Sequence, residues 1–187
     1  MKALYILLVS ILLITSTQAQ EIYQIEKSES SILIKGTSSL HDWESVAEEF
    51  DGAASFLFEE GKLTNIEALS FSVLTESIKS GKRIMDNKTK DALDAKKNPS
   101  IIFSFLSIDE VTEDSITVTG SLKLAGVTKE ISLTSAYMVS PNSNITVSGV
   151  ETINMQDYGV NPPTAMMGTL KTGGIVDVEF KITFSKK

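Results

Sequence analysis

The sequence contains no cysteine and a single histidine, His41. Without cysteine, a disulfide framework, a thiolate metal site and the lipid-attachment residue of a bacterial lipoprotein are all excluded. A zinc site needs two or three nitrogen or sulfur ligands, which one histidine cannot supply, and no EF-hand-like calcium loop occurs. We therefore predict no metal and no cofactor, and a fold that depends on its apolar core.

Long apolar runs are equally scarce, and the one that occurs spans residues 3–14. It is shorter than the ~20 residues that a membrane-spanning helix needs, and a polar stretch with Ala19 near its end follows it. This layout is typical of a secretory signal peptide and fits an uncleaved anchor or a buried first helix less well. We predict a signal peptide over residues 1–19 with cleavage after Ala19, one soluble domain over residues 20–187, and a periplasmic or secreted location.

Basic residues are fewer than acidic ones, so the formal net charge is −7, and it becomes −8 when the predicted signal peptide with Lys2 is removed. This balance argues against nucleic acid as a partner. A membrane-spanning β-barrel would also alternate apolar and polar residues, but aromatic residues are only 7% of this chain and form no evident girdles. The predicted strands are also short for the ~9–11 residues that a tilted membrane-spanning strand needs. We therefore predict no stable membrane insertion.

Apolar and polar residues alternate along much of the remaining chain, most clearly over residues 176–184, as in a half-buried strand. The same alternation over residues 116–124, a turn at Ala125 and Gly126, and a strand around Ile131 and Leu133 predict a hairpin. Further strands are predicted over residues 31–36, 53–58, 63–73, 101–108 and 145–155, with turns between them at residues 59–62 around Gly61, 109–115 and 141–144. Alternation alone does not distinguish an antiparallel sandwich from a closed barrel.

One segment breaks the alternation. Residues 81–97 are rich in Lys, Asp and Ala, and their apolar side chains recur at helical spacing before Asn98 and Pro99. This pattern predicts one amphipathic helix packed on the sheet or capping it. Near the C-terminus, residues 161–168 lack a strand pattern and are predicted to form a loop at one mouth of a barrel.

Catalytic groups are sparse. Ser38, His41 and Asp42 contain the residue types of a triad, but neighbours in an extended segment point to opposite faces and do not converge. No second histidine and no Gly-x-Ser-x-Gly elbow supports such chemistry. Residues 120–126 lack the lysine and hydroxyl of a phosphate-binding loop. We predict that the protein is not an enzyme; catalysis by His41 and Asp42 on a bound lipid is the least favoured alternative.

Three stretches resemble the YceI-like family of exported bacterial proteins described as polyisoprenoid-binding. The first combines residues 23–25, 31–36 and 38–43, the last of which contain the Leu-His-Asp-Trp run. The second spans residues 78–103, from Ile78 through the helical segment to Phe103. The third spans residues 118–129 and contains the run Gly-Ser-Leu-Lys-Leu-Ala-Gly-Val-Thr-Lys. The order and spacing of the three agree with the family across nearly the whole mature chain. The chain departs from the family at residues 83–86, which lack the histidine of the family's Arg-Asp-x-His-Leu pattern. The resemblance therefore does not imply that the helix binds a lipid head group.

The resemblance implies an all-β fold, namely a lipocalin-like, extended, antiparallel eight-stranded β-barrel with one amphipathic helix. It further implies an apolar tunnel that holds an amphiphilic lipid with an isoprenoid tail, such as a quinone or polyprenyl chain, for transport, storage or sequestration. The residues expected to line the tunnel are Trp43, Phe56, Phe58, Phe71, Met85, Phe103, Phe105, Leu122 and Leu133, with Met166 and Met167 near a mouth. The alternative is a structural or partner-binding barrel with a filled core and no ligand. Homodimer formation is left open.

Overall fold

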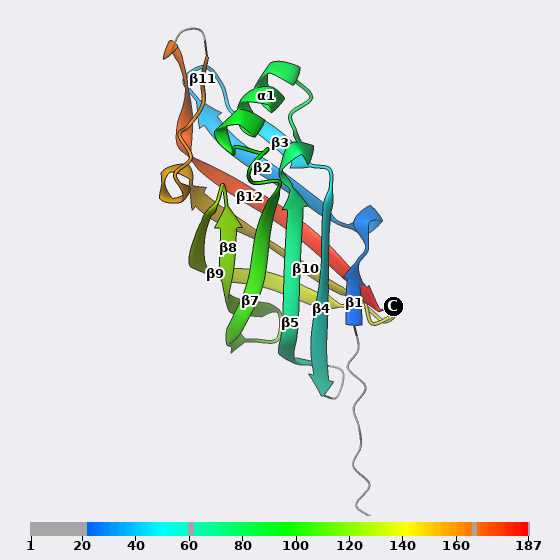
Figure 1. The fold of residues 1–187 in the computed structure, drawn as a ribbon. Helices are drawn as coiled ribbons and strands as arrows, with labels where there is room; N and C mark the ends of the chain where they lie inside the picture. The colour runs from blue at the N-terminus through cyan, green and yellow to red at the C-terminus, as the bar shows by residue number, and fades with distance from the viewer. Residues whose placement is uncertain (1–21, 60–61, 166–167, 187) are drawn as a thin grey trace, which may run out of the picture.

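The fold is described from a computed structural model, in which residues 22–59, 62–165 and 168–186 are described (Figure 1). The predicted signal peptide, the predicted turn around Gly61, and the residues Met166 and Met167 therefore lie outside the described residues.

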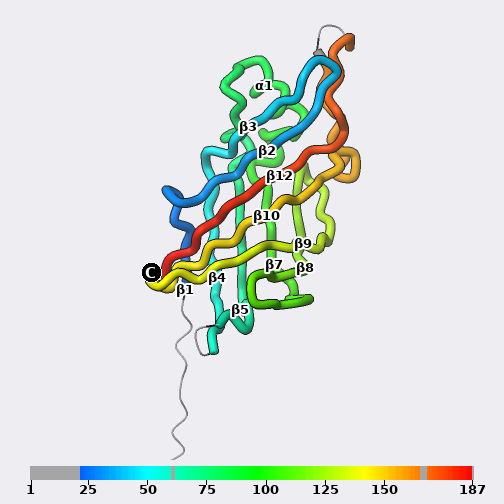
Figure 2. The backbone as a smooth tube through the Cα atoms, turned by 180° about the vertical axis from the view of Figure 1, so that it is seen from behind, coloured from blue at the N-terminus to red at the C-terminus, as the bar shows by residue number. Residues whose placement is uncertain are grey.

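Antiparallel strands pair in the order in which they follow one another along the chain. The strands are β1 (Ile22–Ile25), β2 (Ser31–Ser38), β3 (Trp43–Ala47), β4 (Phe50–Glu59), β5 (Lys62–Leu74), β6 (Ile78–Lys79), β7 (Ser100–Val111), β8 (Ser115–Leu124), β9 (Val127–Val139), β10 (Ile145–Asn154), β11 (Thr164–Ala165) and β12 (Leu170–Lys186). Figure 2 shows β3, β2, β12, β10 and β9 running side by side across one wall.

Three strands of the barrel wall are each interrupted by a short break. The two parts of each interrupted strand together occupy one strand position in the barrel. The short helix η1 (Lys27–Glu29) separates β1 from β2, a short break separates β3 from β4, and η2 (Thr75–Ser77) separates β5 from β6. β1 pairs with β4 while β2 pairs with β3, and both β1 and β2 pair with β12. Counted in this way, the described residues form a closed eight-stranded antiparallel barrel, which confirms the predicted fold.

The barrel closes where the first strand meets the last one. Ile25 lies opposite Phe184, and Tyr23 lies opposite Lys186. Closure matters because an open sheet would leave a row of unpaired backbone groups along its edge. The strands β1, β3, β6 and β11 were not among the predicted ones, because each is so short that it contains too few alternating residues to stand out. β11 lies within the segment predicted as a loop and pairs with β12, so that part of the loop prediction was wrong.

The end of the barrel far from α1 is packed with aromatic rings. The Phe56 ring lies edge-on to Tyr23 at 5.3 Å and edge-on to Phe184 at 5.5 Å between ring centroids. Ile145 beside them is fully buried. Such edge-to-face pairs are a favourable aromatic geometry, so this end forms the solid part of the core.

The helix α1 (Arg83–Ala92) is the one α-helix of the described residues and lies over the opposite end of the barrel (Figure 1). It is shorter than the predicted segment of residues 81–97, because Asp94 adopts a left-handed φ of 46° and the chain continues in turns. The side chain of Asn98 donates a hydrogen bond to the Leu93 carbonyl and satisfies one of the free carbonyls at the helix end.

The predicted turns at residues 125–126 and 141–144 are present in the structure. Ala125 and Gly126 have φ values of 48° and 83°, the positive values that a tight two-residue hairpin turn requires, and they join β8 to β9. Ser143, with φ of 64°, lies in the predicted turn between β9 and β10. These turns keep successive strands adjacent, and that adjacency generates the up-and-down barrel.

Candidate functional site

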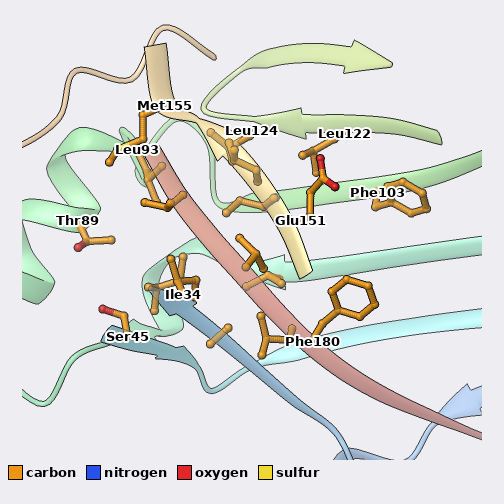
Figure 3. Close-up of a pocket in the computed structure, with 18 of the residues that line it drawn as sticks. Ile34, Ser45, Thr89, Leu93, Phe103, Leu122, Leu124, Glu151, Met155 and Phe180 are labelled. Atoms are coloured by element: carbon orange, nitrogen blue, oxygen red, sulfur yellow. The ribbon is translucent and has the colours of Figure 1, made fainter. Parts of the chain in front are cut away.

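A cavity of about 840 Å³ lies inside the barrel and extends to its α1 end (Figure 3). Its wall comes from the inward-facing residues of the barrel strands and from one side of α1, and it is almost entirely apolar. The volume lies towards the upper end of the ~300–1,000 Å³ that small-molecule sites occupy. The barrel is therefore not filled by its own side chains.

Two phenylalanines on the wall pack closely against glycines of neighbouring strands. A Cβ atom added at Gly120 would lie 2.2 Å from Cζ of Phe103, and one added at Gly149 would lie 2.8 Å from Cζ of Phe180. Each ring thus occupies the space that a side chain on the next strand would take. Because a side chain at either glycine would displace the ring beside it, the two glycines give these rings their places on the wall.

Trp43 follows the same arrangement nearer to the mouth. A Cβ atom at Gly36 would lie 2.3 Å from Cζ2 of Trp43, and the indole Nε1–H donates a 3.0 Å hydrogen bond to the Thr37 carbonyl. The half-buried indole satisfies its polar end with backbone and turns its apolar surface to the cavity.

The mouth of the cavity is formed by α1 and by the segment that leads into β12. Lys88 Nζ donates a 2.6 Å hydrogen bond to the Thr164 carbonyl, which ties the helix to β11 across the opening. Lys82, Arg83 and Lys88 all line this end of the cavity. Cations therefore border the entrance of a chain whose net charge is negative. Pro163 and Thr164 also line the cavity, in agreement with the loop predicted at a mouth.

His41 lies at the same end and is exposed. Its Nδ1 is 2.7 Å from the carbonyl oxygen of Asp42, and the Ser38 hydroxyl donates to the His41 carbonyl at 2.7 Å. The hydroxyl is thus bonded to backbone and not to the imidazole, and the carboxylate of Asp42 does not orient the ring. These contacts organise a turn, and they do not form the relay that a triad requires.

Glu151 on β10 is the one acidic residue among the described residues that line the cavity. Burial raises the pKa of its carboxyl group. Sequence reasoning missed this residue, although a signal was present. Inward positions alternate along β10, and Glu151 falls between the apolar inward residues Val147 and Ile153.

The structure brings most of the predicted wall residues together. The residues on the cavity wall are Trp43, Phe56, Phe71, Met85, Phe103, Leu122 and Leu133. Phe58 and Phe105 do not line the cavity; both are half-buried and pack against the surrounding core. Phe58 pairs with the inward-facing Leu63, and Phe105 follows Phe103 by two residues on the same strand, so both face inward. Phe58 packs against the rings of Tyr23 and Phe56, so it belongs to the aromatic end of the core and not to the cavity.

The described residues contain no group of three or more histidine, cysteine, aspartate or glutamate side chains arranged to hold a metal ion. Within the same residues, no helix is both long enough and apolar enough to cross a membrane.

A model of the YceI-like domain family matches residues 23–184 of the chain. A UPF0312 protein of Pseudomonas savastanoi pv. phaseolicola is 28% identical over 140 residues, which are 71% of this chain and 69% of that protein. BcnA of Burkholderia cenocepacia matches with a TM-score of 0.72 and 16% identity, over 85% of this chain and 98% of BcnA. A polyisoprenoid binding domain from Saccharophagus degradans matches with a TM-score of 0.71 and 14% identity, over 88% of this chain and 98% of that domain. At these identities the two solved structures share the fold.

Proposed function

Because this chain belongs to the YceI-like family and its barrel encloses an apolar cavity, we propose that it binds an amphiphilic lipid with a long isoprenoid-type tail, such as a quinone or polyprenyl chain. The observation that carries the proposal is the open, apolar cavity of about 840 Å³. The similarity to a domain that is itself described as polyisoprenoid binding supports it.

The energetics of such binding depend on area and not on directional contacts. Each 100 Å² of apolar surface removed from water contributes about 2.5 kcal/mol at ~25 cal/mol per Å². A tail that fills the cavity therefore gains several kcal/mol before any polar group is engaged. We infer that the protein carries, stores or sequesters its lipid, and that it does not transform it, since His41, Ser38 and Asp42 form no relay.

Export remains part of the proposal. The layout of the first nineteen residues and the absence of cysteine are consistent with a mature protein that acts in the periplasm or outside the cell. N-terminal sequencing of the protein purified from a periplasmic fraction is expected to begin at Gln20. An N-terminus at Met1 would contradict this part of the proposal.

Lipid binding is tested in two steps. Organic extraction of the untreated protein followed by mass spectrometry is expected to release an isoprenoid lipid, and a fluorescent prenyl or quinone analogue is expected to bind the emptied protein at micromolar concentration. Leu133→Trp, on the cavity wall, should weaken binding of the analogue at least tenfold. Ser132→Trp, next to it on the exposed face of β9, should not.

Two results would overturn the proposal. One is a preparation that contains no lipid and fails to bind the analogue. The other is binding that is equally strong in both tryptophan variants, because the analogue would then lie outside the cavity. Circular dichroism of each variant confirms that it is folded.

A further inference from the structure

Glu151 is the one carboxylate directed into the barrel cavity among the described residues. It lies on β10 directly opposite Val178 of β12, one layer further from the mouth than Ile153 and Val176. Figure 3 shows its carboxylate among the side chains that line the pocket, on the same side as Leu122. The position is inside the barrel and not on its rim.

None of the described residues compensates this carboxylate. Among the described residues, no hydrogen bond or ion pair to the Glu151 side chain is formed, and burial alone accounts for the raised pKa of its carboxyl group. Burial is the largest cause of the raised pKa of Tyr158, followed by the nearby negative charges of Glu151 and then of Asp157. Among the described residues, the Tyr158 hydroxyl forms no hydrogen bond to the Glu151 carboxylate. A polar group left without a partner in apolar surroundings costs free energy.

An apolar tail that fills the cavity would remove the remaining water from this carboxyl group and raise that cost. A ligand avoids the cost only if it brings a polar group to the same depth. A hydroxyl group suits the site in both protonation states, because it donates to a carboxylate and both donates to and accepts from a carboxylic acid. An ether oxygen only accepts, so it has no partner in the ionised form.

A cationic lipid is disfavoured by the entrance. Lys82, Arg83 and Lys88 border the mouth through which the ligand passes, and like charges repel a positively charged head group. Moving an ammonium group into the apolar interior would also carry a large desolvation cost. The charge pattern therefore favours a neutral hydrogen-bond donor on the ligand over a cationic one.

We propose that Glu151 determines ligand specificity by hydrogen bonding to a neutral hydroxyl group of the lipid inside the barrel, so that the cavity prefers prenyl alcohols or phenolic head groups, such as a reduced quinone, over ligands without a donor, such as an oxidised quinone. This inference deepens the proposed function and rests on it. Beyond Glu151, the inward residues of β12 continue through Phe180 and Ile182 to Phe184. The six residue steps from Val178 to Phe184 span about 20 Å of strand at ~3.3 Å per residue, and these inward residues line the cavity down to its aromatic end, which leaves room for a tail beyond the hydroxyl.

The test compares geranylgeraniol with its methyl ether, which share a tail and differ in the donor. Competition against a fluorescent prenyl probe gives both affinities for the wild type, Glu151→Leu, Glu151→Gln and a control, Glu130→Leu, which makes the same change on the exposed outer face of β9. We expect the wild type and the control to prefer the alcohol about tenfold, a factor typical of one hydrogen bond in an apolar site.

Glu151→Leu should bind the ether at least as tightly as the wild type does and lose the preference for the alcohol. Glu151→Gln retains an acceptor and a donor, and should keep part of the preference. Equal affinities for the two probes in the wild type, or a preference that persists in Glu151→Leu, would overturn the role of Glu151 while leaving lipid binding intact. If the wild type binds neither probe, the proposed function fails, and this inference fails with it.

Discussion

The close approach of Phe103 to Gly120 predicts that one added methyl group will obstruct the cavity. In Gly120→Ala the new Cβ would lie 2.2 Å and 2.3 Å from Cζ and Cε2 of Phe103, and 3.0 Å from the backbone oxygen of Ser104. The backbone oxygen is fixed by strand pairing, so the ring must move. Because Phe103 lines the cavity, we expect the ring to swing into the lumen.

The size of the effect follows from the area involved. Overpacking of this kind costs about 1–3 kcal/mol of unfolding free energy. If the displaced ring excludes about 100 Å² of the tail, half of the ~200 Å² that a phenylalanine buries, binding weakens by about 2.5 kcal/mol. A loss of that size raises the Kd roughly 60-fold.

The assay pairs urea unfolding, followed by circular dichroism, with titration of a fluorescent prenyl probe. Gly174→Ala is the matched control, because a Cβ there would meet only Pro162, at an ordinary 3.8 Å. It should leave the Kd unchanged and stability unchanged or raised by up to ~1 kcal/mol. The double variant Phe103→Leu with Gly120→Ala should regain most of the affinity. If Gly120→Ala matches the wild type in both measurements, the wall-packing argument is wrong.

Three further predictions address the core, the mouth and the interior charge. Ile145→Ala should lower the free energy of unfolding by about 2–5 kcal/mol in urea titrations, because Ile145 is fully buried; a loss below 1 kcal/mol would contradict the packing. Lys88→Ala removes the 2.6 Å bond to the Thr164 carbonyl and should speed release of a fluorescent probe in stopped-flow experiments, whereas an unchanged rate would mean that this contact does not restrain the mouth. Burial raises the pKa of Glu151 in the folded state, so the folded protein holds this proton more tightly than the unfolded chain, and stability should fall as the pH rises from the unfolded value near ~4.3 through the raised one. Glu151→Gln should remove that decline; a stability profile identical to the wild type would refute the assignment.

The sequence determined the fold class and most of the wall. Period-two alternation of apolar residues specifies which face of a strand is buried, and glycine and polar clusters specify where strands end. The alternation therefore predicts that Leu122 and Leu133 face inward, and the structure puts both on the cavity wall. The resemblance to a family supplied the choice of a barrel over a sandwich, which alternation cannot make.

Only the tertiary structure decided whether the inward residues meet or leave space. Gly120 and Phe103 are seventeen residues apart, and nothing local in the sequence indicates that the ring lies over the glycine and leaves the lumen open. The same holds for Phe58 and Phe105, which face inward but pack in the core beyond the cavity, and for Glu151, whose lack of a partner among the described residues depends on distant strands. Periodicity fixes the direction of a side chain relative to its own strand, whereas the empty volume depends on how all the strands close around it.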